Sequence, residues 1–309
     1  MFISTSLLLW HGFSVCLGAY AERQWAETAA LAASFGVDVS LTGNRGPIVR
    51  EEDNFMAHPY LRDLLLEKEG PKATALARFK SLLTPGLPTV AEDLEAGQSV
   101  DFEDLAAGIN LEWPELLEGT RPTDSAALQV LRATGLSGIP WEELETASNK
   151  RASQLPPIGS LPPEDDFTAP ENTLRFESGL IPLLQVGRLR LHAAIACGEP
   201  EQAMGVLKIQ RRLGDAHAGR PNLMDAMAAN LVTMQMLAGV KAGVRSGGWR
   251  PQDWTWLAGW AGTIDGADLL AKAWAAEIYF GINAVRHTER FPDVEDLQFQ
   301  NASGILGGN

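Results

Sequence analysis

Apolar residues recur every three or four positions through residues 171–290, which is the spacing of one face of an α-helix. The pattern predicts long helices over 174–197 and 221–246, a helix between them that opens at Glu199, and a last long helix from Asp265. Proline in a first helical turn, as at Pro200, favours a helix start, and acidic residues beside it favour the same end. We therefore expect an all-α fold, with an irregular helical bundle in this half.

The first two of these helices are joined by a short turn at Gly198, with the small residues Ala193, Ala194 and Ala203 on either side. Small residues flanking a tight turn are typical of the helix pairs of tetratricopeptide repeats. No second copy follows at a fixed period, which a true repeat protein requires. We expect a solenoid-like, tetratricopeptide-like helix hairpin in the C-terminal half.

Each predicted helix has an apolar face, and the third is rich in methionine. Lys208, Arg211 and Arg212 are expected on the outside of the second helix or toward its end. We favour core packing for the methionines, which commonly fill gaps in cores, over a methionine-lined groove for a partner helix. The three faces comprise Leu180, Leu183, Leu184, Leu191 and Ile195; Ala203, Val206, Leu207 and Ile209; and Leu223, Met224, Met227, Leu231, Met234, Leu237 and Val240.

Four tryptophans, Trp249, Trp254, Trp256 and Trp260, lie within twelve residues before the last predicted helix. Flat aromatic rings stack on sugars or bases, but they also bury large apolar areas where helices meet. We favour the second role. Glu277, beside the apolar face of the last helix, is expected to need a charged partner if it is buried.

The rest of the chain divides by composition. Residues 22–153 predict an irregular helical region, with short helices over 124–136 and 141–151 and acids at 51–53 suited to a helix N-terminus or a cation. The proline-rich stretch 154–170 predicts an extended linker, which either separates two domains or straps across one. The bundle domain then covers 171–290, and the glycine-containing tail 291–309 is expected to be flexible.

Residues 1–21 contain a long apolar run without a charged side chain between Phe2 and Ala21. Its length fits a membrane anchor, and Ala19-Tyr20-Ala21 fits the small-x-small cleavage pattern of a signal peptide. No Lys or Arg precedes the run, so a buried first helix in a cytoplasmic protein stays a third possibility. We expect a cell-envelope protein, either anchored by a single membrane span or exported to the periplasmic side.

The charge balance limits the partners. The 25 basic and 39 acidic residues give a net charge of −14, which disfavours nucleic-acid binding because phosphates need clustered Lys and Arg. Residues 91–120 hold nine acids and no base, whereas 185–250 hold nine bases and four acids. The two regions either face one another or the basic one meets an acidic partner. Cys16 and Cys197 cannot make a disulfide framework.

Several short motifs, spread over most of the chain after the apolar N-terminus, resemble a family of membrane-anchored helical proteins common in planctomycete and verrucomicrobial genomes. The resemblance implies a helical architecture and a membrane location, and no activity. At 278 this chain has Ile where the family usually has Arg. The matching motifs are Glu52-Asp53-Asn54-Phe55-Met56 with Pro59 and Leu61, Leu189-Arg190-Leu191 with Gly198, Gly248-Trp249 with Gln252, and Ala276-Glu277 with Phe280-Gly281.

No pattern of catalytic or ligand-binding residues emerges. The five histidines, His11, His58, His192, His217 and His287, lack metal-ligand spacing, and phosphate-loop, dinucleotide and nucleophile-turn motifs are missing. We predict no catalytic, cofactor-binding or metal-binding residue and no cofactor. The expected function is a non-catalytic scaffold or protein-binding module at the cell envelope. The alternative is a helical envelope hydrolase that acts on a polysaccharide through the tryptophans and paired acids such as Glu277.

Overall fold

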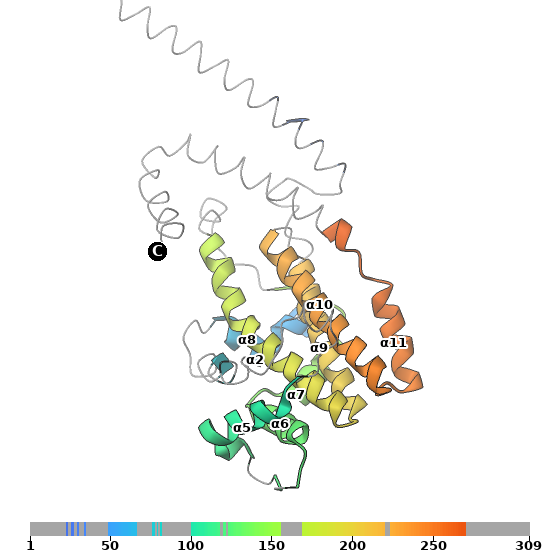
Figure 1. Cartoon of the computed structure of the whole chain (residues 1–309). Coiled ribbons are helices and arrows are strands. Elements are labelled where there is room, and N and C mark those ends of the chain that lie inside the picture. Colours follow the sequence, from blue (N-terminus) through green and yellow to red (C-terminus); the bar gives the residue numbers. More distant parts are fainter. Residues whose placement is uncertain are drawn as a thin grey trace, which may run out of the picture. The chain divides into compact units, whose positions relative to one another are not determined.

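A computed structural model gives the fold (Figure 1). It describes residues 49–66, 100–117, 120–121, 123–155, 169–219 and 223–269, and the single residues 23, 26, 27, 30, 34, 76, 77, 79 and 81. These residues are helical or lie in turns and connections, and no β-strand occurs among them. The all-α prediction is confirmed for this part of the chain. The predicted anchor or signal 1–21 and tail 291–309 lie outside it.

The contacts divide the chain into two compact units, and one of them, 47–220 with 224–266, holds all the named elements but for the first residue of α10. The other consists of 1–46, 221–223 and 267–309 and contains few described residues. None of the helices in the described residues is both long and apolar enough to cross a membrane. The elements are η2 (Glu51–Asp53), η3 (Phe55–Ala57), α2 (Pro59–Leu66), α5 (Phe102–Glu112), η4 (Pro114–Leu117), α6 (Ala126–Gly135), α7 (Trp141–Ala147), α8 (Ala169–Ala196), α9 (Pro200–Ala218), α10 (Leu223–Ser246) and α11 (Pro251–Ala261).

The centre of the described unit is α8, which packs against α2, α6 and α9. All five predicted core residues of this helix, from Leu180 to Ile195, are buried. Gly198 ends the turn after it with φ +70°, a conformation that glycine adopts without strain. The next helix, α9, begins at Pro200 as predicted, and its four predicted apolar residues are also buried.

The third predicted apolar face, on α10, is correct only in part, since Leu237 and Val240 are partly buried against the core. Met227 is 58% exposed and Leu231 is 40% exposed, so they do not pack in the core as expected. The side chain of Met224 lies outside the described residues. The buried face instead carries small residues with a few larger ones, namely Ala226, Ala229, Val232, Gln235, Met236 and Ala238.

Glycines explain why this side of α10 faces inward. A Cβ at Gly239 would overlap with the side chain of Leu191 on α8, and a Cβ at Gly243 would overlap with the indole of Trp249. Small residues let neighbouring side chains and backbones approach closely, which improves packing contacts. On α10 the polar residues Asp225 and Gln235 are fully buried, whereas Met227 is exposed, so hydrophobicity alone did not separate its two faces.

The N-terminal part of the described unit is joined to the rest by a short parallel bridge between Asn54 and Ala152. Acids 51–53 form their own 3₁₀ turn, η2, and α2 begins later, at Pro59. In the described part of the acidic segment 91–120, Glu103, Glu112 and Glu115 are exposed. The pattern did not predict α5, whose Leu105, Ala106 and Ile109 are nonetheless buried.

Helix α8 begins at Ala169, so the predicted extended linker 154–170 runs two residues too far. Residues 156–168 lie outside the described part of the chain. The described helices on either side of this segment share one hydrophobic core, which contains Phe55 and Val130 as well as Leu180 and Leu207. This core positions α7, α9 and α11 around the groove described next.

Candidate functional site

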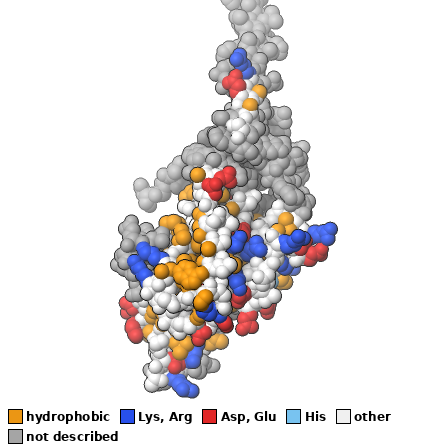
Figure 2. Space-filling view, turned by 90° about the vertical axis from the view of Figure 1, so that its right-hand side faces the viewer, with side chains coloured by type: hydrophobic (Ala, Val, Ile, Leu, Met, Phe, Trp, Pro, Cys, Tyr) orange, Lys and Arg blue, Asp and Glu red, His pale blue; other side chains and the backbone are white. Residues whose placement is uncertain are grey.

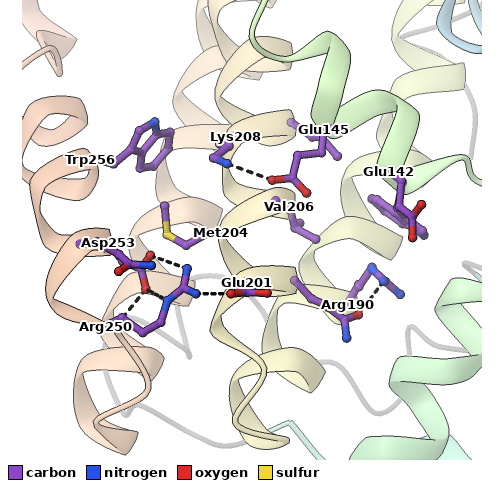
Figure 3. Close-up of a pocket in the computed structure, with 15 residues that line it drawn as sticks. Glu142, Glu145, Arg190, Glu201, Met204, Val206, Lys208, Arg250, Asp253 and Trp256 are labelled. Carbon is purple, nitrogen blue, oxygen red and sulfur yellow. Dashed lines mark hydrogen bonds and ion pairs between the residues drawn. The ribbon is translucent and has the colours of Figure 1, made fainter.

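A groove of about 710 Å³ lies between α7, α9 and α11, and α8 contributes one side chain to it (Figure 3). Aliphatic and aromatic side chains line it together with charged ones. Its 15 lining residues are Trp141, Glu142, Glu145, Arg190, Glu201, Gln202, Met204, Gly205, Val206, Lys208, Ile209, Arg250, Gln252, Asp253 and Trp256. Seen from the side of the molecule where α11 lies in Figure 1, exposed hydrophobic side chains occur beside both signs of charge (Figure 2).

The first ion pair of the groove joins α7 to α9. The Lys208 ammonium lies 2.9 Å from Glu145 Oε1, and both side chains are about one third exposed. Gly205 makes room for this pair, because a Cβ there would overlap with the Glu145 carboxylate. The missing side chain thus lets a carboxylate lie directly against the backbone of α9.

The second cluster joins the start of α11 to the start of α9. Arg250 donates to both carboxylate oxygens of Asp253, at 3.1 and 3.0 Å, and to the carboxylate of Glu201. Asp253 also accepts a hydrogen bond from the Arg250 backbone N–H at 2.9 Å and so caps the N-terminus of α11. Burial acts to raise the pKa of Asp253, but the hydrogen bonds and charge of Arg250 outweigh it and lower the pKa below its usual value.

A third cation, Arg190, enters the groove from α8 and lies over the ring of Trp141 at 5.3 Å from its centroid. Its guanidinium donates to Leu131 O and Thr134 Oγ1 on α6, at 3.2 and 3.3 Å, and to Gln202 Oε1 at 2.8 Å. Burial lowers the pKa of Arg190, and the nearby charge of Glu142 partly offsets this effect. The guanidinium is thus held in place by α6 and α9.

Of the four tryptophans expected to fill the joint between helices, Trp249 and Trp260 are buried, as predicted. The indole N–H of Trp249 donates to Val240 O at 3.0 Å, which ties the turn after α10 back to that helix. Trp256 is half-buried at the groove, where it stacks on Trp260 and lies under Arg211. Trp254 is 45% exposed and is not a groove residue.

The predicted charged faces are arranged differently from the expectation. Lys208, Arg211 and Arg212 were expected on the outside of α9, but all three contact neighbouring elements. Lys208 pairs with α7, Arg211 lies over Trp256 of α11, and Arg212 donates through Nε to Ser148 O, at the end of α7, at 2.7 Å. The acids that pair with the basic region therefore include Glu145 and Asp253, which lie outside residues 91–120.

Three of the five histidines fall in the described residues, whereas His11, His287, Glu277 and Cys16 do not. His217 lies 2.6 Å from the Asp225 carboxylate, and both side chains are buried at the junction of α9 and α10. No pattern in the sequence predicted this pair, because the two residues lie on different helices. No group of three or more potential metal-binding side chains occurs among the residues described.

Three of the four carboxylates of the groove are paired with cations. A polysaccharide hydrolase needs two carboxyls with distinct roles, one of them with a raised pKa. In the groove Glu145, Glu201 and Asp253 are each held by a cation, and the pKa of Asp253 is lowered. The sequence could not show the groove, since its residues come from segments more than 100 positions apart.

The chain matches no family model, no curated protein and no solved structure in the comparisons made with them. The resemblance to membrane-anchored helical proteins therefore stays a prediction.

Proposed function

We propose that this protein is a non-catalytic helical scaffold that binds another protein through the groove between α7, α9 and α11. In this proposal α8 and α9 form the tetratricopeptide-like hairpin that carries the groove, and residues 1–21 place the protein at the cell envelope as an anchor or a signal. The envelope location rests on the apolar pattern of those residues alone.

The observation that carries the proposal is a groove in which aromatic surface and pre-paired charges occur together. The half-buried ring of Trp256 supplies apolar area, and the ion pairs of Lys208 and Arg250 line the same groove (Figure 3). Met204, Val206 and Ile209 of α9 are buried beneath it. Protein interfaces commonly combine an apolar centre with a polar rim.

Fixed side chains favour recognition because they lose little conformational freedom when a partner arrives. Arg250 is held by two acids, and Arg190 by α6 and α9. For the hydrolase alternative, the groove does bring carboxylates near Trp256, but Glu145, Glu201 and Asp253 are each paired with a cation.

The proposal is tested by placing a photo-crosslinking amino acid at Gln252, in the groove, in the full chain expressed in its native cells. The matched position is Leu111 on α5, which is 80% exposed and lies away from the groove. We expect a discrete protein adduct from Gln252 and none from Leu111. Equal labelling at both positions, or no adduct at Gln252, would contradict the proposal.

A further inference from the structure

The two arginines of the groove use most of their donors inside the protein. Arg250 donates through Nε and both terminal nitrogens to Asp253 and Glu201. Arg190 donates through both terminal nitrogens to α6 and to Gln202. Guanidinium groups have no acceptor, and their donors are the only means by which they bind an anion. Three of the five N–H donors of each guanidinium are thus used inside the protein, which reduces its capacity to bind an anionic partner.

The carboxylates of the groove keep acceptor capacity. Each ionised carboxylate has about four lone-pair sites. The Glu201 side chain is 80% exposed and contacts Arg250 through Oε1. Glu145 likewise contacts Lys208 through Oε1, and its Oε2 lies toward Gly205. Glu142 is exposed at the edge of the groove (Figure 3).

The charge of the groove points the same way. It contains four carboxylates, Glu142, Glu145, Glu201 and Asp253, against the three cations of Arg190, Lys208 and Arg250. The whole chain has a net charge of −14, which attracts cationic groups over long range. The groove therefore carries an excess of negative charge and of hydrogen-bond acceptors.

We propose that the partner segment recognised by the groove is a peptide that presents Lys or Arg side chains. Their N–H groups donate to Glu142, Glu145 and Glu201, and its apolar residues pack on the half-buried ring of Trp256. This inference rests on the proposed function and names the chemistry of its partner. Charge-assisted hydrogen bonds of this kind give an interface its specificity and register.

The probe is a fluorescein-labelled peptide in which Lys alternates with Leu, and its counterpart has Glu at every Lys position. Binding to the full chain is followed by fluorescence anisotropy at low and high salt. The test variant combines Glu142→Gln with Glu201→Gln. The matched control combines Glu103→Gln with Glu115→Gln, which removes the same charge from exposed positions outside the groove.

We expect the groove variant to bind the Lys peptide about fivefold more weakly, since exposed charge pairs contribute roughly 0.2–1 kcal/mol each. The control variant should change the Kd by less than about twofold, because screening by salt limits the effect of distant charges. The Glu peptide should not bind. Equal weakening in both variants, absence of Lys-peptide binding, or tighter binding of the Glu peptide would overturn the inference.

These outcomes are separate from those of the crosslinking test. A discrete adduct at Gln252, together with equal weakening in both variants, would support the proposed protein binding and contradict the preference for a cationic peptide. Absence of any adduct at Gln252 would contradict the proposed protein binding itself.

Discussion

Single polar side chains hold together segments of the described unit that are far apart in the chain. The side-chain Oδ1 of Asn54 accepts from Met56 N and Gln154 N, at 3.1 and 2.8 Å, and its Nδ2 donates to Gln154 O at 2.7 Å. A buried side-chain amide whose oxygen and nitrogen both form hydrogen bonds in this way holds the two chain segments together. Phe55 and Met56, which follow it, are fully buried.

His192 is a residue whose environment makes stability depend on pH. It lies buried on α8, where burial and the charge of Arg188 lower its pKa to about 4. The unfolded chain takes up this proton near pH 6.5, whereas the folded protein does so only near pH 4. Stability from this group is therefore complete above pH 6.5 and is lost as the pH falls toward 4.

We predict that His192→Gln weakens the acid sensitivity of the protein. The loss of unfolding free energy between pH 7 and pH 4.5 should be smaller in the variant than in the wild type by about 2–3 kcal/mol. Urea denaturation of both proteins at the two pH values measures this difference. An identical loss in the two proteins would show that His192 takes up its proton as readily when folded as when unfolded.

At the scale of elements, glycines decide how closely helices approach. Gly243 of α10 lies against the rigid indole of Trp249, whereas Gly205 of α9 lies against the end of the flexible Glu145 side chain. The first neighbour is buried and cannot move without disturbing the core. The second can swing toward solvent.

Replacing each of the two glycines with alanine should therefore change the stability of the protein differently. We expect Gly243→Ala to reduce the free energy of unfolding by about 1–3 kcal/mol, the usual cost of overpacking a core. Gly205→Ala should leave it unchanged or raise it by up to about 1 kcal/mol, because alanine favours the helix. Urea unfolding of both variants measures the difference, and equal destabilisation would argue against the contacts described.

Element-scale contacts also explain the charged face of α9. Arg212 donates to Ser148 O and Lys150 O beyond the end of α7, and Ser153 Oγ donates back to Arg212 O. Carbonyls at a helix end have no partner within the helix, so a guanidinium there stabilises both elements. A pattern of charges every few residues does not distinguish such a contact from a solvated face.

At the scale of the whole described unit, one core joins the helices on both sides of residues 156–168. Helix α8 packs against α2 and α6 from the N-terminal side and against α9 from the C-terminal side. Removing the N-terminal elements would expose apolar faces of α8 to water, which costs about 25 cal/mol for each Å² exposed.

The fragment 171–290, which the sequence marked as a separate bundle domain, should therefore not fold cooperatively on its own. We expect helical far-UV circular dichroism, a broad thermal transition and binding of a hydrophobic dye, as in states that retain helices without fixed packing. The full chain should unfold more sharply. A fragment that unfolds cooperatively at the temperature of the full chain would instead establish an independent domain.

The sequence by itself determined the helical class and the positions of α8, α9 and α10, because helix periodicity and the punctuation at Pro200 and Gly198 are local properties of the chain. It also determined the buried faces of α8 and α9, where apolar and polar positions differ clearly. It did not determine the inner face of α10, where burial does not follow hydrophobicity. Only the tertiary structure decided that face, the Asn54 bridge and the groove, because each depends on which distant segments meet: Asn54 with Gln154, Gly239 with Leu191, and Glu145 with Lys208.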